Sequence, residues 1–189
     1  MVIRSAALNR GYSLVELMVA LFLTSLVILA VGSLYISVLK EQVKRTEKLA
    51  VMQGLNEVSG YLKNDLLRAG YSDSGLLTLS GSNKTIWSTA SEMGYRYYFD
   101  GEYIATKFKL VDGVFKLCRK KSSSEVFLSD CTHYFSMTDP NVLLLSQFSV
   151  TSHIFGFDAS HKKLSITMSA ANPQGEYGVE QAFELVQRN

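Results

Sequence analysis

The chain begins with an apolar block whose pattern of polar and apolar positions differs from that of everything after it. From Tyr12 to Leu39 the only charged residue is Glu16, and there is no proline. A helix of this length would span roughly 40 Å, more than the roughly 30 Å hydrocarbon core of a bilayer. Because a core helix of a soluble domain rarely stays apolar on every face for so long, the pattern predicts a membrane-spanning helix.

A secretory signal peptide is the other interpretation of a basic and apolar N-terminus. Such a peptide has a shorter apolar stretch, followed by a cleavage site of small residues. Here the apolar stretch is longer and no clean site of that kind follows it. The segment before it, 1–11, is short and basic, with Arg4 and Arg10.

The next segment, 40–69, is polar but keeps the periodicity of a helix. Its apolar residues recur at spacings of three or four, which indicates an amphipathic helix with one buried stripe. The stripe consists of Val51, Leu55, Val58, Leu62, Leu66 and Ala69. With the apolar block this predicts one helix of up to 58 residues, with Gly70 as its stop and Gly32 as a point where it can kink.

After residue 71 the periodicity changes to that of β-strands. Ser72–Asn83 is rich in Ser and Gly and indicates a loop, and Asp112-Gly113 is a strong hairpin signal. Aromatic and β-branched residues dominate the later segments, so we expect an antiparallel sheet packed on the amphipathic half of the helix, an α+β two-layer domain. The predicted strands are Tyr95–Phe99, Tyr103–Leu110, Val114–Arg119, Glu125–Leu128, Val142–Val150, Ile154–Phe157, Leu164–Ser169 and Val179–Val186.

A short motif at the start of the apolar block resembles the class III signal of type IV prepilins. It reads Arg-Gly-Tyr-Ser-Leu-Val-Glu and covers residues 10–16. In that family a membrane peptidase cuts after the glycine, on the cytoplasmic side, and methylates the new N-terminal amine. The resemblance implies cleavage between Gly11 and Tyr12, N-methylation of Tyr12, and Glu16 as the fifth mature residue. Tyr12 departs from the family, where Phe is usual, but it is also aromatic.

Glu16 is a candidate functional residue because a carboxylate inside a membrane segment is costly and needs a partner. Considered alone, it also fits at the interface, with its side chain among the headgroups. The resemblance implies instead that it pairs with the N-terminal ammonium of a neighbouring subunit. An unpaired charge among packed helices costs several kcal/mol, so the pair would set the axial register of assembly.

The end of the predicted helix adds to the resemblance. Lys63–Tyr71 (KNDLLRAGY) resembles the helix ending of PilW-like minor pilins, and pseudopilin J of type II secretion has a related ending. The final Val-Gln-Arg-Asn also resembles the last strand of PilW-like chains, although this match is short. Asp65 and Arg68 lie one turn apart, and we expect them to pair on the surface.

The resemblance implies a pilin-like fold and a function as a minor pilin that initiates assembly of a type IV pilus or lies near its tip. A minor pseudopilin of a type II secretion system is an alternative. The implied parts are a cleaved leader (1–11), a membrane and filament-core helix segment (12–39), an amphipathic helix segment (40–70) and a globular β domain (71–189).

The implied location is the inner membrane, with the N-terminus cytoplasmic and the C-terminal domain periplasmic, and later the extracellular pilus. The positive-inside rule does not decide this orientation, because Lys and Arg residues flank both ends of the apolar block. The implied partners are the prepilin peptidase, other minor and major pilins, the inner-membrane assembly platform and, before assembly, inner-membrane lipid.

Charge and cysteine content limit the remaining functions. The net charge of +2 comes from Arg4 and Arg10, and a neutral body argues against attraction of the whole domain to nucleic acid. Cys118 and Cys131 are expected to form a disulfide outside the cytoplasm, whereas in the cytosol two free thiols are expected.

A short basic run lies between the two cysteines. Arg119, Lys120 and Lys121 are candidate DNA contacts, which gives a third alternative, a DNA-binding minor pilin for DNA uptake. The other interpretation of this run is a solvated turn between strands.

No motif for catalysis or metal binding occurs in the chain. There is no G-x-S-x-G, no P-loop and no H-E-x-x-H. His133, His153 and His161 lack the spacing of metal ligands, and two cysteines alone make a poor ligand set. We therefore expect a structural protein without a cofactor or a metal, and not an enzyme.

Overall fold

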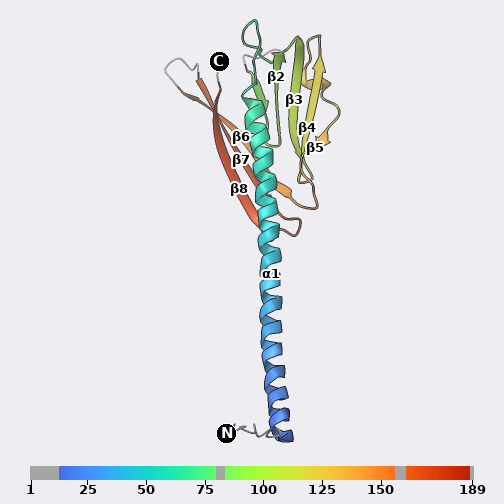
Figure 1. Ribbon diagram of the computed structural model, residues 1–189. Coiled ribbons are helices and arrows are strands. Elements are labelled where there is room, and N and C mark those ends of the chain that lie inside the picture. The colour runs from blue at the N-terminus through green and yellow to red at the C-terminus, as the bar shows by residue number, and fades with distance from the viewer. Residues whose placement is uncertain (1–12, 80–83, 156–160, 188–189) are drawn as a thin grey trace, which may run out of the picture. The chain divides into compact units, whose positions relative to one another are not determined.

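The computed structural model describes residues 13–79, 84–155 and 161–187. Contacts divide the chain into two units, Met1–Arg45 and Thr46–Asn189, and α1 belongs to both. In chain order the elements are α1 (Leu14–Leu66), β1 (Ile86–Ser88), β2 (Glu92–Phe99), β3 (Glu102–Val111), β4 (Val114–Ser122), η1 (Leu128–Asp130), β5 (Phe135–Ser136), β6 (Leu144–Phe155), β7 (His161–Ala171) and β8 (Gly178–Gln187) (Figure 1).

The described part of the first unit is a stretch of α1 whose side chains are all exposed. This helix is long and apolar enough to cross a membrane. The hydroxyls of Thr24, Ser25 and Ser33 each donate to a backbone carbonyl three or four residues earlier, at 2.7–2.8 Å. These polar groups are therefore satisfied within the helix, as a lipid environment requires. The helix is continuous through Gly32.

In the second unit, α1 contributes one apolar stripe to the core. All six residues of the predicted stripe are buried, each with an exposed fraction of 6% or less. Burying a Val or Leu side chain contributes roughly 1.5–3 kcal/mol. Burial of the stripe, rather than helix propensity, is therefore what holds this part of α1 in place.

α1 ends at Leu66, four residues before the predicted stop, and a tight turn carries the chain to Gly70. In this turn backbone N–H groups donate to carbonyls three residues earlier, which tightens the last coil. Gly70 has a φ of +78°, and its N–H donates to the carbonyl of Arg96 in β2 at 2.8 Å. A Cβ at this position would lie 2.7 Å from Cγ2 of Thr85, so both the backbone angle and the space require glycine.

Two antiparallel sheets, rather than the one expected, complete the second unit. One has five strands in the order β1-β2-β3-β4-β5, and the other has three in the order β6-β7-β8. Figure 1 shows one sheet on each side of the upper part of α1, and residues from both sheets and from α1 form a single core cluster. The predicted fold class, a long N-terminal helix packed on antiparallel β-structure, is confirmed, but there are two sheets and not one.

Two Asp-Gly turns set the register of the five-stranded sheet. Asp100-Gly101 joins β2 to β3, and Asp112-Gly113 joins β3 to β4. All four residues have φ between 53° and 79°, as type I′ hairpin turns require. The predicted hairpin at Asp112-Gly113 is therefore confirmed.

Three of the predicted strands were wrong in detail. Glu125–Leu128 is not a strand, because its apolar residues pack as a loop that leads into the 3-10 turn η1. Val142–Val150 and Ile154–Phe157 were expected as separate strands, but Leu144–Phe155 is one strand, β6. The polar residues at 151–153 suggested a break, although polar residues are compatible with the middle of a strand that has one solvated face.

Contacts between aromatic rings join the two sheets, and a polar contact ties α1 to the smaller one. Phe115 of β4 lies between Phe108 of β3 and Phe148 of β6, with ring centroids 5.6 and 4.9 Å away. The hydroxyl of Ser59 in α1 donates to the side-chain oxygen of Gln181 in β8 at 2.9 Å. The second unit therefore has one core shared by the helix and both sheets.

We expect Gly70→Ala to destabilise the protein more than Gly101→Ala does. Both glycines have φ near +80°, so each substitution carries the penalty of a left-handed alanine, about 1–2 kcal/mol. Only at Gly70 does the new Cβ meet another side chain, and such overlap adds roughly 1–3 kcal/mol. Urea unfolding of both full-length variants in detergent micelles measures the difference, and equal losses would contradict the steric argument.

Candidate functional site

The structure describes only part of the candidate processing signal. Gly11 and Tyr12 lie outside the described residues, whereas Glu16 lies in the first turn of α1 and is exposed. Among the described residues, Glu16 forms no hydrogen bond or ion pair. Its carboxylate therefore has to find a partner outside this part of the subunit, in headgroups or in another chain.

Asp65, in the segment that resembles the PilW-like ending, is the buried centre of a polar cluster. It is 5% exposed and accepts hydrogen bonds from the hydroxyl of Tyr95 and from Nη2 of Arg119, the latter at 2.6 Å. Arg68 lies 3.9 Å away, on the exposed side. The predicted pair of Asp65 and Arg68 is therefore present, but only Arg68 is at the surface. Asp65 follows Leu62 by three residues and so lies on the buried face of the helix.

The Asp65 cluster connects α1 to β2 and β4. Burial raises the pKa of Tyr95 well above 10.0, and the charge of Asp65 and the hydrogen bond to it raise this pKa further. Tyr95 is therefore a neutral donor. The guanidinium of Arg119 balances the carboxylate and lies 5.8 Å from the ring centroid of Tyr61. Helix and sheet are thus held together by a charged pair and two aromatic rings.

The three basic residues considered for DNA contact do not form one basic surface. They lie in strand β4 and not in a turn. The side chain of Arg119 is bound to Asp65, and Nζ of Lys121 lies 4.0 Å from a carboxylate oxygen of Glu102. Lys120 points to the opposite face, because side chains alternate along a strand.

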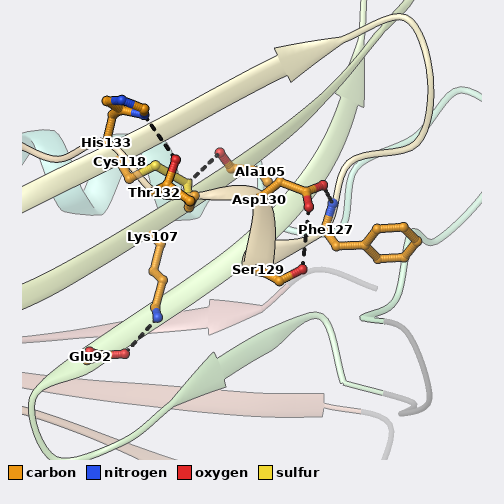
Figure 2. Close-up of a disulfide and its surroundings, with 10 residues drawn as sticks. Glu92, Ala105, Lys107, Cys118, Phe127, Ser129, Asp130, Thr132 and His133 are labelled. Carbon is orange, nitrogen blue, oxygen red and sulfur yellow. Dashed lines mark hydrogen bonds and ion pairs between the residues drawn. A yellow bond between two sulfur atoms is a disulfide. The ribbon is translucent and has the colours of Figure 1, made fainter.

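Cys118 and Cys131 are joined in a disulfide, with Cα atoms 5.7 Å apart (Figure 2). This bond fastens residues 123–134, here called the Cys131 loop, to β4. Within the loop, a carboxylate oxygen of Asp130 accepts a hydrogen bond from the backbone N–H of Phe127 at 2.8 Å. Closing a loop of this length stabilises a protein by about 3 kcal/mol in the chain-entropy model.

A cavity of about 540 Å³ lies between the Cys131 loop and β1. Its lining includes two cations, Arg96 and Lys107. Arg96 is 3% exposed and pairs with Glu125 at 2.8 Å, and Lys107 pairs with Glu92 at the same distance (Figure 2 shows the latter pair). Since each cation already has an acidic partner, this cavity presents no unmatched charge to a ligand.

The described residues contain no group of three or more His, Cys, Asp or Glu side chains that could hold a metal ion. His133 is exposed, and its Nδ1 lies 3.0 Å from the hydroxyl of Thr132. His153 and His161 lie in β6 and β7.

The apolar helix and the α+β unit define the class of the protein, which is that of type IV prepilin-like chains. Residues 44–185 match the family of prepilin peptidase-dependent protein B, and residues 7–32 match the prokaryotic N-terminal methylation motif. The first match covers well over half of the chain, so the protein belongs to the prepilin peptidase-dependent protein B family. No curated protein and no solved structure matches the chain.

This membership confirms the prepilin interpretation of the sequence. It implies processing by a prepilin peptidase and assembly of the pilin type, and both matched families consist of pilin-like structural proteins. The matched methylation motif contains Gly11, Tyr12 and Glu16. Together with the apolar helix, it indicates that the protein is anchored in a membrane.

We expect Asp65→Asn to lower the free energy of unfolding by about 1–3 kcal/mol, because it leaves the guanidinium of Arg119 without its counter-charge. The side chain of Arg119 is 27% exposed, and solvent therefore moderates the loss. Arg68→Ala, which removes only an exposed cation, is the matched control and should change stability by less than about 0.5 kcal/mol. Denaturant unfolding of the full-length protein compares them, and similar losses would contradict a buried role for Asp65.

The raised pKa of Tyr95 predicts a dependence on alkaline pH. Since the folded state favours the protonated hydroxyl, its stabilising contribution is complete below pH 10.0 and is lost as the pH rises through the folded-state pKa. Tyr95→Phe removes this group. The difference in unfolding free energy between wild type and Tyr95→Phe should therefore shrink above pH 10.0, and a difference that stays constant to higher pH would contradict the linkage.

Proposed function

We propose that this chain is a minor pilin, a structural subunit that initiates assembly of a type IV pilus or lies in its tip complex. In this proposal the peptidase cleaves between Gly11 and Tyr12 and methylates the amine of Tyr12. The observation that carries the proposal is the N-terminal methylation motif at the start of an exposed apolar helix, with Glu16 as the only charged residue of the segment Tyr12–Leu39.

The chemistry of the helix explains why such a subunit can change surroundings. An exposed apolar surface is stable in lipid, and it is equally stable against the apolar helices of other subunits. The charge on Glu16 is the exception, because it needs a counter-charge wherever lipid headgroups and water are absent. The methylated ammonium of Tyr12 on a neighbouring subunit would supply this charge, and only in the correct axial register.

The role as a minor subunit draws on the segment Lys63–Tyr71, which resembles the PilW-like ending. A minor pseudopilin of a type II secretion system is a second candidate, because pseudopilin J has a related ending. A DNA-uptake role has less support, since Arg119 is bound to Asp65 in the structure. The genes that neighbour this one would distinguish the first two candidates.

The proposal also assigns a location and partners. Before assembly the protein would lie in the inner membrane, with the N-terminus cytoplasmic and the second unit periplasmic. Its partners would be the peptidase, the assembly platform and other pilins, and its final location would be the extracellular filament.

We expect Glu16→Ala to leave leader cleavage intact and to reduce incorporation into filaments by about tenfold or more, since several kcal/mol of register-dependent pairing are lost. Immunoblots of sheared filaments and of membranes measure incorporation and cleavage separately. Glu16→Asp keeps the charge and is the matched control. Normal incorporation of Glu16→Ala would contradict the register role.

Intact-mass spectrometry of the unreduced protein from its host tests the processing step directly. The expected mass is that of Tyr12–Asn189 plus one methyl group and minus the two hydrogens of the disulfide. Gly11→Val should remain at full length. A full-length, unmethylated wild-type protein in cells with an active prepilin peptidase would overturn the proposal.

A further inference from the structure

A pocket of about 250 Å³ opens on the surface of the second unit, beside the turn that follows α1. We call it the Arg68 pocket. It is formed by the turn after the helix, the start of the following loop and the end of β2. Its lining residues are Leu67, Arg68, Tyr71, Tyr97 and Phe99.

The walls of the Arg68 pocket are large apolar side chains that the fold leaves exposed. Leu67 is 61% exposed, Phe99 60% and Tyr71 51%. One exposed apolar residue needs no explanation, but several around one pocket mark a surface that binds something. Aromatic residues and arginine are also the residue types that dominate the centres of protein–protein interfaces.

The pocket also presents a hydrogen-bond donor, the guanidinium of Arg68. Tyr97 lines the pocket as well but is only 2% exposed. The side chain of Arg68 is 62% exposed and lies 3.9 Å from Asp65, beyond the reach of a good hydrogen bond. Asp65 lies closer to Arg119, at 2.6 Å, so the charge of Arg68 is only weakly matched.

This combination defines the chemistry of the occupant. The aromatic rings and the aliphatic side chain of Leu67 can contact an apolar side chain, while the guanidinium of Arg68 donates to an acceptor, best a carboxylate. The larger cavity behind the Cys131 loop differs in this respect, because Arg96 and Lys107 already have acidic partners. Charge complementarity therefore favours the Arg68 pocket as the place where a negatively charged group binds.

We propose that the Arg68 pocket docks a segment of a neighbouring pilin subunit that presents an apolar side chain next to an Asp or Glu. The apolar side chain fills the space between Leu67 and Phe99, and the carboxylate accepts hydrogen bonds from Arg68. The identity of the partner as a pilin rests on the proposed function, whereas the chemistry of the pocket does not.

Site-specific photo-crosslinking of the full-length protein in its host tests this docking. A benzoylphenylalanine at position 99 should give an adduct with another pilin, and the modified peptide should lie next to an acidic residue. Phe135 is the matched control, because it is an equally exposed phenylalanine, 68% against 60%, in β5 of the same sheet. Adducts at position 99 that are no more abundant than those at position 135 would overturn the proposal.

Charge variants of Arg68 distinguish specific docking of a carboxylate from nonspecific hydrophobic binding to the aromatic rings. Arg68→Glu should lower the yield of the adduct at position 99 about tenfold, the effect of losing one central interface residue, and Arg68→Lys should retain most of it. Normal abundance of each variant and an intact disulfide on non-reducing gels show that the fold is preserved. A yield that Arg68→Glu leaves unchanged would overturn the role of the carboxylate.

The outcomes also distinguish this proposal from the proposed function. A chain that is cleaved, methylated and incorporated but gives no adduct at position 99 keeps the minor-pilin function and overturns the docking pocket. An adduct with a protein that is not a pilin, whose yield depends on Arg68, overturns the proposed partner and counts against the minor-pilin function, but it keeps the chemistry of the pocket.

Discussion

Both sheets of the second unit bury one face against the apolar stripe of α1. Each stripe residue contributes roughly 1.5–3 kcal/mol when buried, so the stripe as a whole contributes on the order of 10 kcal/mol. This is comparable to the entire net stability of an ordinary domain. The two sheets also contact each other directly, through the rings of Phe115 and Phe148 and the hydrogen bond from Leu145 to Gly113. Without the helix, neither sheet would have a complete core.

A buried charge adds specificity to this apolar contact. Hydrophobic burial tolerates small shifts of a helix along a sheet, whereas the pair of Asp65 and Arg119 does not, because a shift of one turn would leave a carboxylate buried without its counter-charge. Tyr95 further restricts the position of α1 relative to β2, since its hydroxyl must also reach Asp65. The cluster therefore fixes the end of α1 relative to β2 and β4. It stands just before the turn at Gly70, where the chain leaves the helix.

Much of this architecture could be predicted from periodicity. The spacing of Val51, Leu55, Val58 and Leu62 identified the buried face of the helix, and the Asp112-Gly113 pair identified a hairpin. Periodicity did not reveal the second sheet. The strands of two sheets that share one core show the same alternation of apolar and polar residues as the strands of a single sheet. It also missed Asp65, since a charged residue beside an apolar stripe is ordinarily at the surface. The Arg68 pocket could not be predicted, because its lining residues come together only when the turn after α1 meets the end of β2.

The division of contacts between Arg45 and Thr46 has a consequence for biogenesis. The core and the disulfide lie wholly after this point, so the second unit can fold and oxidise while the apolar helix remains in a bilayer. In the filament assembly that we propose, extraction of the subunit from lipid would exchange one apolar environment for another around the residues before 46. No core contact would have to break in that transfer. The free-energy cost of extraction would then come only from removing the apolar helix from lipid.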